Sequence, residues 1–213
     1  MTTESPQGLL HVIASPRAAS RSRAAAQAFI DERKRLEPSL QADELDLWSL
    51  ELPQLEGDTL AAKYAVLARA QHTDPQQQAW AVVTREAQRF AGYRDYVFSV
   101  PMWNFGIPYR LKHYIDIVTQ PGQTFSWTPQ RGYEGLLHGR RALIACASAF
   151  DYAPGTPLHP LDLQKDYLRG WLRLVGIEDV KQVDCGPTSA AMPASGPAQE
   201  RAAQSARALA RDW

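Results

Sequence analysis

Three serines stand at the start of a predicted helix, directly after a short apolar run: Ser15, Ser20 and Ser22. A helix N-terminus offers unpaired backbone N–H groups and the positive end of the helix dipole. Such a site holds a phosphate without a glycine-rich loop, and Arg17 or Arg21 of the same segment could add a charge-assisted contact. The alternative is that Ser20 is only the helix N-cap and that the other hydroxyls are solvated.

A second segment crowds large side chains between two prolines. Pro101 is followed by Met102, Trp103, Asn104 and Phe105. A flat aromatic ligand lying on a rigid backbone accounts for this composition, and Asn104 could hydrogen-bond the edge of a heterocycle or simply close a turn. Taken alone, such Met, Trp and Phe side chains are more often core than a platform for a ligand.

A third segment, 147–152, follows another buried run. Asp151 and Tyr152 are weak candidates for a proton donor to a substrate, and the alternative is that Asp151 is a solvated loop residue. No other side chains form a convincing catalytic triad. No His or Cys spacing predicts a metal site.

Alternating strand and helix patterns place these three segments in a fold. Apolar or alternating runs predict strands over 9–14, 41–48, 96–100, 142–147 and 180–183, and helical spacing predicts helices between them, the last two over 161–176 and 202–209. Strands alternating with helices indicate a doubly wound parallel α/β sheet with helices on both faces, and five strands favour the order 2-1-3-4-5. Ligands bind such sheets beyond the carboxyl ends of the strands. We therefore expect the segments after strands 1, 3 and 4 to form one site.

Composition excludes several classes of protein. The 213 residues contain 23 Lys+Arg and 23 Asp+Glu, so no bulk charge attracts nucleic acid or an anionic membrane. No stretch is apolar enough to span a membrane, and neither a kinase nor a dinucleotide-binding glycine motif occurs. Two cysteines, Cys146 and Cys185, are expected to be buried thiols in a reduced, cytoplasmic setting. We expect a flexible polar tail over 1–8 and a single domain over 9–213.

The block PMWNFGIPYRLKHYIDIV, residues 101–118, resembles the NAD(P)H-dependent FMN reductases of the azoreductase and quinone-reductase family. That family usually has a Pro-Met-Tyr-Asn-Phe turn and then a Leu-Lys-x-x-x-Asp helix. The family's phosphate loop is similar to residues 9–23, LLHVIASPRAASRSR. Its hairpin and fourth strand are similar to residues 124–144, TFSWTPQRGYEGLLHGRRALI. Its helix before strand five is similar to residues 166–180, DYLRGWLRLVGIEDV. The resemblance covers nearly the whole chain and implies a flavodoxin-like fold.

The resemblance also implies a cofactor and an activity. FMN would be held noncovalently, its phosphate by Ser15, Ser20, Arg21 and Ser22 and its ring system along residues 101–105. NADH or NADPH would donate a hydride, which passes through FMN to a quinone, azo, nitro or related aromatic acceptor in ping-pong order. Because the flavin carries this chemistry, no catalytic side chain is required. The family works as a homodimer with the flavin near the subunit boundary.

The sequence departs from the family after its fourth strand. A glycine-rich turn is usual there, whereas this chain has Ser148, Ala149 and Phe150. Glycine permits positive φ and close backbone approach, which phenylalanine does not do cheaply. Ser148 could still donate a hydrogen bond to the flavin, and Phe150 could stack over the ring or block it.

Two hypotheses remain open from the sequence. The first is an FMN-dependent oxidoreductase whose unusual substrate pocket has as its walls Phe125, Trp127, Phe150 and Tyr152. The second is a relative that has lost FMN binding and acts as a ligand-binding or structural module, or as a non-redox enzyme on an aromatic substrate.

Overall fold

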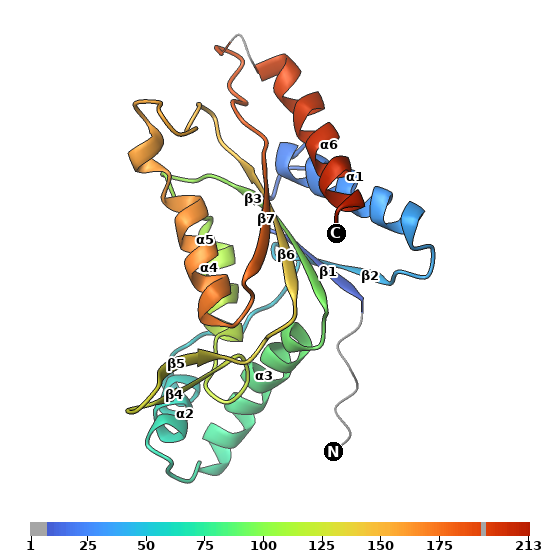
Figure 1. The fold of residues 1–213 in the computed structure, drawn as a ribbon. Helices are drawn as coiled ribbons and strands as arrows, with labels where there is room; N and C mark the ends of the chain where they lie inside the picture. Colours follow the sequence, from blue (N-terminus) through green and yellow to red (C-terminus); the bar gives the residue numbers. More distant parts are fainter. Residues whose placement is uncertain (1–7, 193–194) are drawn as a thin grey trace.

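The computed structural model describes residues 8–192 and 195–213, in which strands and helices alternate along the chain (Figure 1). The strands are β1 (Leu9–Ile13), β2 (Ala42–Asp46), β3 (Asp95–Pro101), β4 (Phe125–Thr128), β5 (Gly132–Gly135), β6 (Arg141–Ala147) and β7 (Asp179–Asp184). The helices are α1 (Arg21–Leu36), α2 (Gly57–Leu67), α3 (Asp74–Ala91), α4 (Tyr109–Val118), α5 (Leu163–Leu174) and α6 (Ser195–Arg211), with one 3-10 turn, η1 (His159–Leu161).

Gly8 belongs to the fold rather than to the predicted flexible tail. Its carbonyl accepts hydrogen bonds from the backbone N–H groups of Arg94 and Asp95, which lead into β3. Residues 1–7, the rest of that predicted tail, lie outside the described residues.

Five parallel strands form the central sheet in the order β2-β1-β3-β6-β7. β1 pairs with β3 from Leu9 opposite Asp95 to Ile13 opposite Ser99. The predicted five-stranded parallel sheet is therefore confirmed. β4 and β5 form a separate antiparallel hairpin, so the strands predicted as fourth and fifth are β6 and β7.

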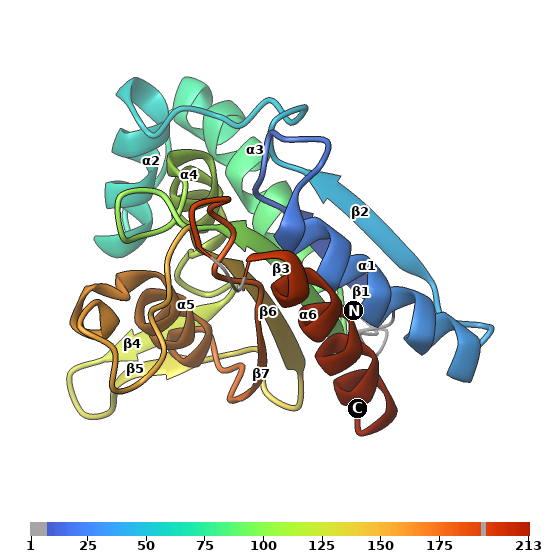
Figure 2. The same cartoon turned by 90° about the horizontal axis from the view of Figure 1, so that it is seen from above.

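Helices cover both faces of the sheet. Figures 1 and 2 show α1 and α6 side by side on one face, with α3, α4 and α5 on the other. Leu9 belongs to the apolar core under α1 and α6, whereas Leu10 and Val12 belong to the core on the opposite face. All five residues of β1 are buried, as expected for a strand covered on both faces.

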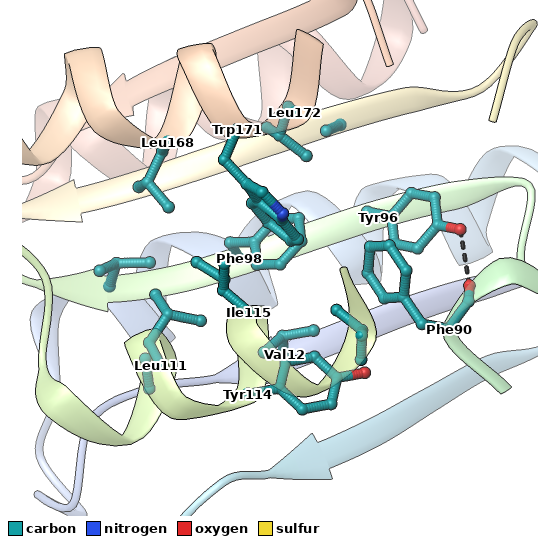
Figure 3. Close-up of a cluster of buried hydrophobic side chains, with 14 of the residues drawn as sticks. Val12, Phe90, Tyr96, Phe98, Leu111, Tyr114, Ile115, Leu168, Trp171 and Leu172 are labelled. Carbon is teal, nitrogen blue, oxygen red and sulfur yellow. Dashed lines mark hydrogen bonds between the residues drawn. The ribbon is translucent and has the colours of Figure 1, made fainter. Parts of the chain in front are cut away.

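Aromatic rings fix the centre of the sheet beneath α3 and α5 (Figure 3). Phe90 of α3 packs against Tyr96 of β3 at 4.7 Å between ring centroids and against Trp171 of α5 at 5.7 Å. The Tyr96 hydroxyl donates to the Phe90 carbonyl at 2.7 Å. Burial raises the pKa of Tyr96 to about 12, so this hydroxyl stays a donor at neutral pH. These contacts hold the strand that carries the second candidate segment.

Local capping explains where the helices begin. The Ser20 hydroxyl accepts the Arg23 N–H, which makes Ser20 the N-cap of α1. The Asp162 carboxylate accepts the Lys165 N–H and starts α5 at Leu163, two residues later than predicted. α6 starts at Ser195, whereas the sequence predicted a start at Ala202. Pro197 lies in its first turn, where a helix tolerates proline.

Within the described part of the chain, no helix combines the length and apolarity needed to cross a membrane.

Candidate functional site

The loops after β1, β3 and β6 meet at the carboxyl edge of the sheet, because these three strands are neighbours in it. The Met102 N–H donates to the Ala147 carbonyl at 2.7 Å, and the Ala14 N–H donates to the Ser99 carbonyl at 3.0 Å. The structure therefore brings the segments 15–22, 101–106 and 147–152 to one edge. A crevice at this position is where open α/β sheets bind ligands.

The three serines line the first of these loops and are all buried. The Ser20 and Ser22 hydroxyls lie 3.0 Å apart at the N-terminus of α1, and the Ser15 hydroxyl accepts the Arg17 N–H at 3.4 Å. Arg17 and Arg21 line an adjoining cavity of about 510 Å³. Buried hydroxyls, first-turn N–H groups and nearby guanidinium groups together suit a phosphate monoester.

His11 lies beneath this loop and is fully buried in β1. Its Nε2 atom is 3.1 Å from the Ser99 hydroxyl. Burial, and secondarily the positive charge of Arg23, lower the pKa of His11 to about 4. The imidazole is therefore neutral at physiological pH and joins β1 to β3 without adding charge to the site.

The loop after β3 is a tight turn under backbone strain. The Trp103 and Gly106 backbones exchange two hydrogen bonds, of 3.0 and 2.9 Å. The two residues between them, Asn104 and Phe105, have φ angles of 48° and 69°. A two-residue turn with both φ values positive usually carries glycine, and a bulky residue in that conformation is rare. Backbone strain of this kind is most common at functional and ligand-binding sites. Trp103, Asn104 and Phe105 are all exposed at the protein surface.

Trp48 supports this turn, a role that the sequence analysis missed. Its ring centroid lies 5.7 Å from that of Trp103 and 5.5 Å from that of Tyr109. The Trp48 indole N–H donates to the carbonyl of Ala14, at the end of β1. Arg110 of α4 donates to the Leu47 carbonyl at 3.0 Å and so fixes the segment that carries Trp48. Trp48 is the last residue of the predicted second strand, 41–48, and nothing in that local pattern marks its contact with the turn.

The loop after β6 keeps an ordinary backbone without glycine. Among the described residues, positive φ outside glycine occurs only at Arg69, Asn104 and Phe105, so neither Ala149 nor Phe150 is strained. The Ser148 hydroxyl donates to the Phe150 carbonyl at 2.8 Å. The loop thus accommodates Ala149 and Phe150 without a positive φ, and the effect of the missing glycines on a flavin contact stays a prediction.

Asp151 and Tyr152 have structural roles in this loop. The Asp151 carboxylate accepts the Ala153 N–H at 2.9 Å, which closes a local turn. Tyr152 is buried, and its carbonyl lies 3.1 Å from Nδ1 of His159. Phe150, Asp151 and Tyr152 line a polar cavity of about 380 Å³ on the side of β7, together with Lys165 and Asp184. Proton donation by Asp151 or Tyr152 stays a prediction.

The structure does not bring Phe125 and Trp127 to this site within one chain. Both lie on the β4–β5 hairpin, which contacts the segment before β7: the Leu137 N–H donates to the Val175 carbonyl at 2.9 Å. That segment precedes β7, so the hairpin lies at the amino end of the sheet, opposite the three loops (Figure 1). Phe125 and Trp127 therefore cannot join Phe150 and Tyr152 in a pocket made by one chain alone.

A large apolar cavity opens next to the strained turn. It measures about 780 Å³, and its lining includes Trp103, Tyr109, Leu163 and Tyr167. Lys112 also borders it, and this ammonium is paired with Asp116 at 2.6 Å. The cavity has the size and apolar lining of a site for a planar aromatic molecule.

The described residues contain no group of His, Cys, Asp and Glu side chains that could hold a metal ion. Cys146 and Cys185 are buried, as predicted. Burial raises the pKa of Cys185 to about 12, and that of Cys146 also rises, so both thiols are poor nucleophiles.

Comparisons with known proteins agree with this geometry. The flavodoxin-like fold family matches residues 7–210. An FMN-dependent NADH:quinone oxidoreductase of Ruegeria pomeroyi is 42% identical over 181 residues, covering 84% of this chain and 89% of that protein. A second such protein, from Pseudomonas fluorescens, is 37% identical over 205 residues and 95% of each chain. Among solved structures, an FMN-dependent NADH-azoreductase of Bacillus anthracis in complex with FMN matches with a TM-score of 0.85 and 25% identity, covering 97% of this chain and 98% of that one.

The family match spans residues 7–210, and the Pseudomonas fluorescens relative is more than one third identical over 95% of this chain. The chain belongs to the flavodoxin-like family, among the FMN-dependent NADH:quinone oxidoreductases and azoreductases.

Proposed function

We propose that this chain binds FMN and passes a hydride from NADH, through FMN, to a quinone, azo or related aromatic acceptor. The observation that carries the proposal is the convergence of three loops on one edge of the sheet. These are the loop with buried serines after β1, the strained turn after β3, and the loop after β6, whose Ala149 and Phe150 N–H groups donate to no other described residue. Relatives named as NADH:quinone oxidoreductases support the same activity and favour NADH over NADPH.

The residues present fit FMN. Ser15, Ser20, Ser22 and Arg21 would hold the phosphate, since buried hydroxyls lie beside the first turn of α1. Residues 101–105 would lie along the ring system, and Ser148 to Phe150 would meet its remaining edge. The turn after β3 is supported by Trp48, whose ring packs against Trp103, and Arg110 fixes the segment that carries Trp48. This preorganisation spares the cost of ordering the loop at the moment of binding.

Bound FMN supplies the hydride chemistry, and the protein supplies binding and orientation. Trp103 and Tyr109 form an apolar wall at the cavity where an aromatic acceptor is placed. The largely apolar lining of this cavity favours contact with a flat aromatic molecule. A neutral His11 keeps the strand beneath the phosphate loop free of added charge. No side chain of this chain needs to act as a nucleophile.

We infer that the protein is a single domain over residues 9–213 and works as a homodimer in the cytoplasm. Large apolar side chains are exposed on α5 and on the hairpin, among them Leu163, Trp127 and Tyr133. A second copy could cover this surface and bring its own hairpin, with Phe125 and Trp127, toward the flavin site. Two buried, unpaired thiols are consistent with a reducing compartment.

The visible absorbance spectrum tests the cofactor directly. Purified protein is incubated with FMN and passed through gel filtration to remove unbound FMN. Its absorbance is then scanned over the wavelengths at which flavins absorb. A retained flavin spectrum that bleaches on NADH addition and recovers on quinone addition is the expected result. A colourless protein that reduces no quinone would instead favour a relative that has lost FMN.

A further inference from the structure

The backbone N–H groups of Ala149 and Phe150 are available to a ligand. Both residues are exposed, and neither N–H donates a hydrogen bond to another described residue. The carbonyls of the same two peptide units belong to Ser148 and Ala149. These carbonyls accept the N–H groups of Thr188 and Ser189, each at 3.0 Å.

Peptide geometry determines where the free N–H groups point. Both peptide units are trans, since Gly186–Pro187 is the sole cis bond in the described chain. The C=O and N–H of a trans unit point in opposite directions. The two N–H groups therefore point away from the loop after β7. Because β6 lies between β3 and β7 in the sheet, that direction leads toward the turn after β3 and the crevice assigned to FMN.

Thr188 holds this arrangement with its side chain as well as its backbone. Its hydroxyl donates to the Ser148 carbonyl at 3.1 Å, so this one carbonyl accepts two hydrogen bonds from Thr188. Gly186 lets the two loops come this close, because a Cβ atom there would lie 2.5 Å from the Ser148 hydroxyl. The close approach that its family obtains with glycines after β6 is thus supported here from the loop after β7.

We propose that Thr188 is a positioning residue that orients the Ala149 and Phe150 N–H groups as donors to the pyrimidine edge of FMN. The inference rests on the proposed function. Electron density on that edge increases when the flavin is reduced, so two fixed donors stabilise reduced FMN more than oxidised FMN. Thr188 therefore raises the midpoint potential of the bound cofactor without touching it.

The test measures the midpoint potential of bound FMN by equilibration with a redox dye. In Thr188→Val, the ratio of reduced-FMN to oxidised-FMN affinity is expected to fall about tenfold, which for a two-electron couple is a potential about 30 mV lower. Thr188→Ser keeps the hydroxyl and is expected to restore the wild-type value. Ser189→Ala is the matched control, since that hydroxyl accepts the Ala191 N–H and the contact to Ala149 is through the backbone.

The outcomes separate this inference from the function on which it rests. Thr188→Val protein that binds FMN at an unchanged potential, even with lowered stability, would mean that Thr188 is only structural and would overturn the inference alone. If Thr188→Val does not fold, Thr188→Ala provides the same comparison against Thr188→Ser. Wild-type protein that retains no FMN would overturn the proposed function together with this inference.

Discussion

Phe105 occupies a backbone conformation, φ of 69°, that costs a non-glycine residue about 1–2 kcal/mol. Phe105→Gly would place the favoured Asn-Gly pair at the centre of the turn. Because the phenyl ring is 42% exposed, little burial is lost. We expect the apoprotein to unfold at higher urea, by about 1 kcal/mol in unfolding free energy, while FMN affinity falls as the ring contact is lost.

Phe150→Gly is the matched control for this change. Phe150 is similarly exposed but has no positive φ, so glycine relieves no strain there. It should cost about 0.5–1 kcal/mol of stability through backbone entropy, and change the preference among quinones of different size. Equal stability changes in the two variants would contradict the assignment of strain to Phe105.

Ser22→Ala tests the phosphate site. The Ser22 hydroxyl is buried 3.0 Å from that of Ser20, so its loss removes one donor to the phosphate. A hydrogen bond to a charged group contributes about 1.5–3 kcal/mol, and FMN affinity should fall roughly tenfold or more. Riboflavin lacks the phosphate and serves as the internal control. Fluorescence titration should show its affinity unchanged, and an equal loss for both ligands would place the phosphate elsewhere.

Site residues differ in how far the sequence alone predicts them. Ser20, Ser22 and the turn at Asn104 and Phe105 lie in local patterns directly after apolar strands, and the structure brings them to one edge. Trp48 acts only through contacts across the sheet, so no local pattern marks its role. Thr188 likewise depends on a loop whose shape is set by pairing with another loop.

β1 carries a pH-dependent contribution to stability through His11. Its pKa in the folded chain is about 4, below the ordinary 6.5, because burial disfavours the charged form. The unfolded chain therefore binds the extra proton first as pH falls. Stability from this group is complete above pH 6.5 and is lost toward pH 4, by about 3 kcal/mol in total.

The comparison with His11→Gln isolates this effect. Glutamine can still hydrogen-bond the Ser99 hydroxyl but does not titrate. Urea unfolding at several pH values between 4.5 and 7.5 should show a shallower loss of stability in the variant. Identical slopes would mean that other groups cause the acid sensitivity, such as the Arg23–Glu44 pair close to His11.

The hairpin depends on a contact between two glycines. A Cβ atom on Gly135 would lie 2.1 Å from the backbone nitrogen of Gly176, at the end of α5. Gly135→Ala forces backbone apart and should lower the melting temperature, with a cost of about 3 kcal/mol. Gly170→Ala, within α5 and in open space, should instead stabilise by about 0.5–1 kcal/mol. A tolerated Gly135→Ala would mean that the hairpin can move away from α5.

Elements of the central sheet were predictable because each strand is a short apolar or alternating run bounded by turn residues. The described sheet contains all five predicted strands, with ends that differ by one or two residues. The start of α6 was not predictable, because Ser195, Gly196 and Pro197 have loop composition. The hairpin's position was also hidden, since its contact with Val175 and Gly176 joins segments distant in sequence.

Exposed apolar side chains are unevenly distributed over the molecule. Leu163 and Tyr167 of α5, Tyr109 of α4 and Tyr133 of the hairpin are exposed on the side of the sheet opposite α1. Among the described residues of α1 and α6, only Leu36 is a comparable exposed side chain. With equal numbers of positive and negative side chains, no net charge opposes the association of two copies.

A homodimer that uses the α5 face predicts opposite behaviour for two sets of charge substitutions. Leu163→Asp combined with Tyr167→Asp places carboxylates where apolar surface would be buried, and should convert the dimer to a monomer in sedimentation velocity runs. Leu36→Asp lies on the far side of the sheet and should leave the mass unchanged. The monomer should also lose quinone reductase activity, because Leu163 and Tyr167 line the cavity assigned to the acceptor and because the hairpin with Trp127 cannot reach the flavin site of its own chain. A double variant that stays dimeric would place the interface on another face, and an active monomer would mean that the site is complete in one chain.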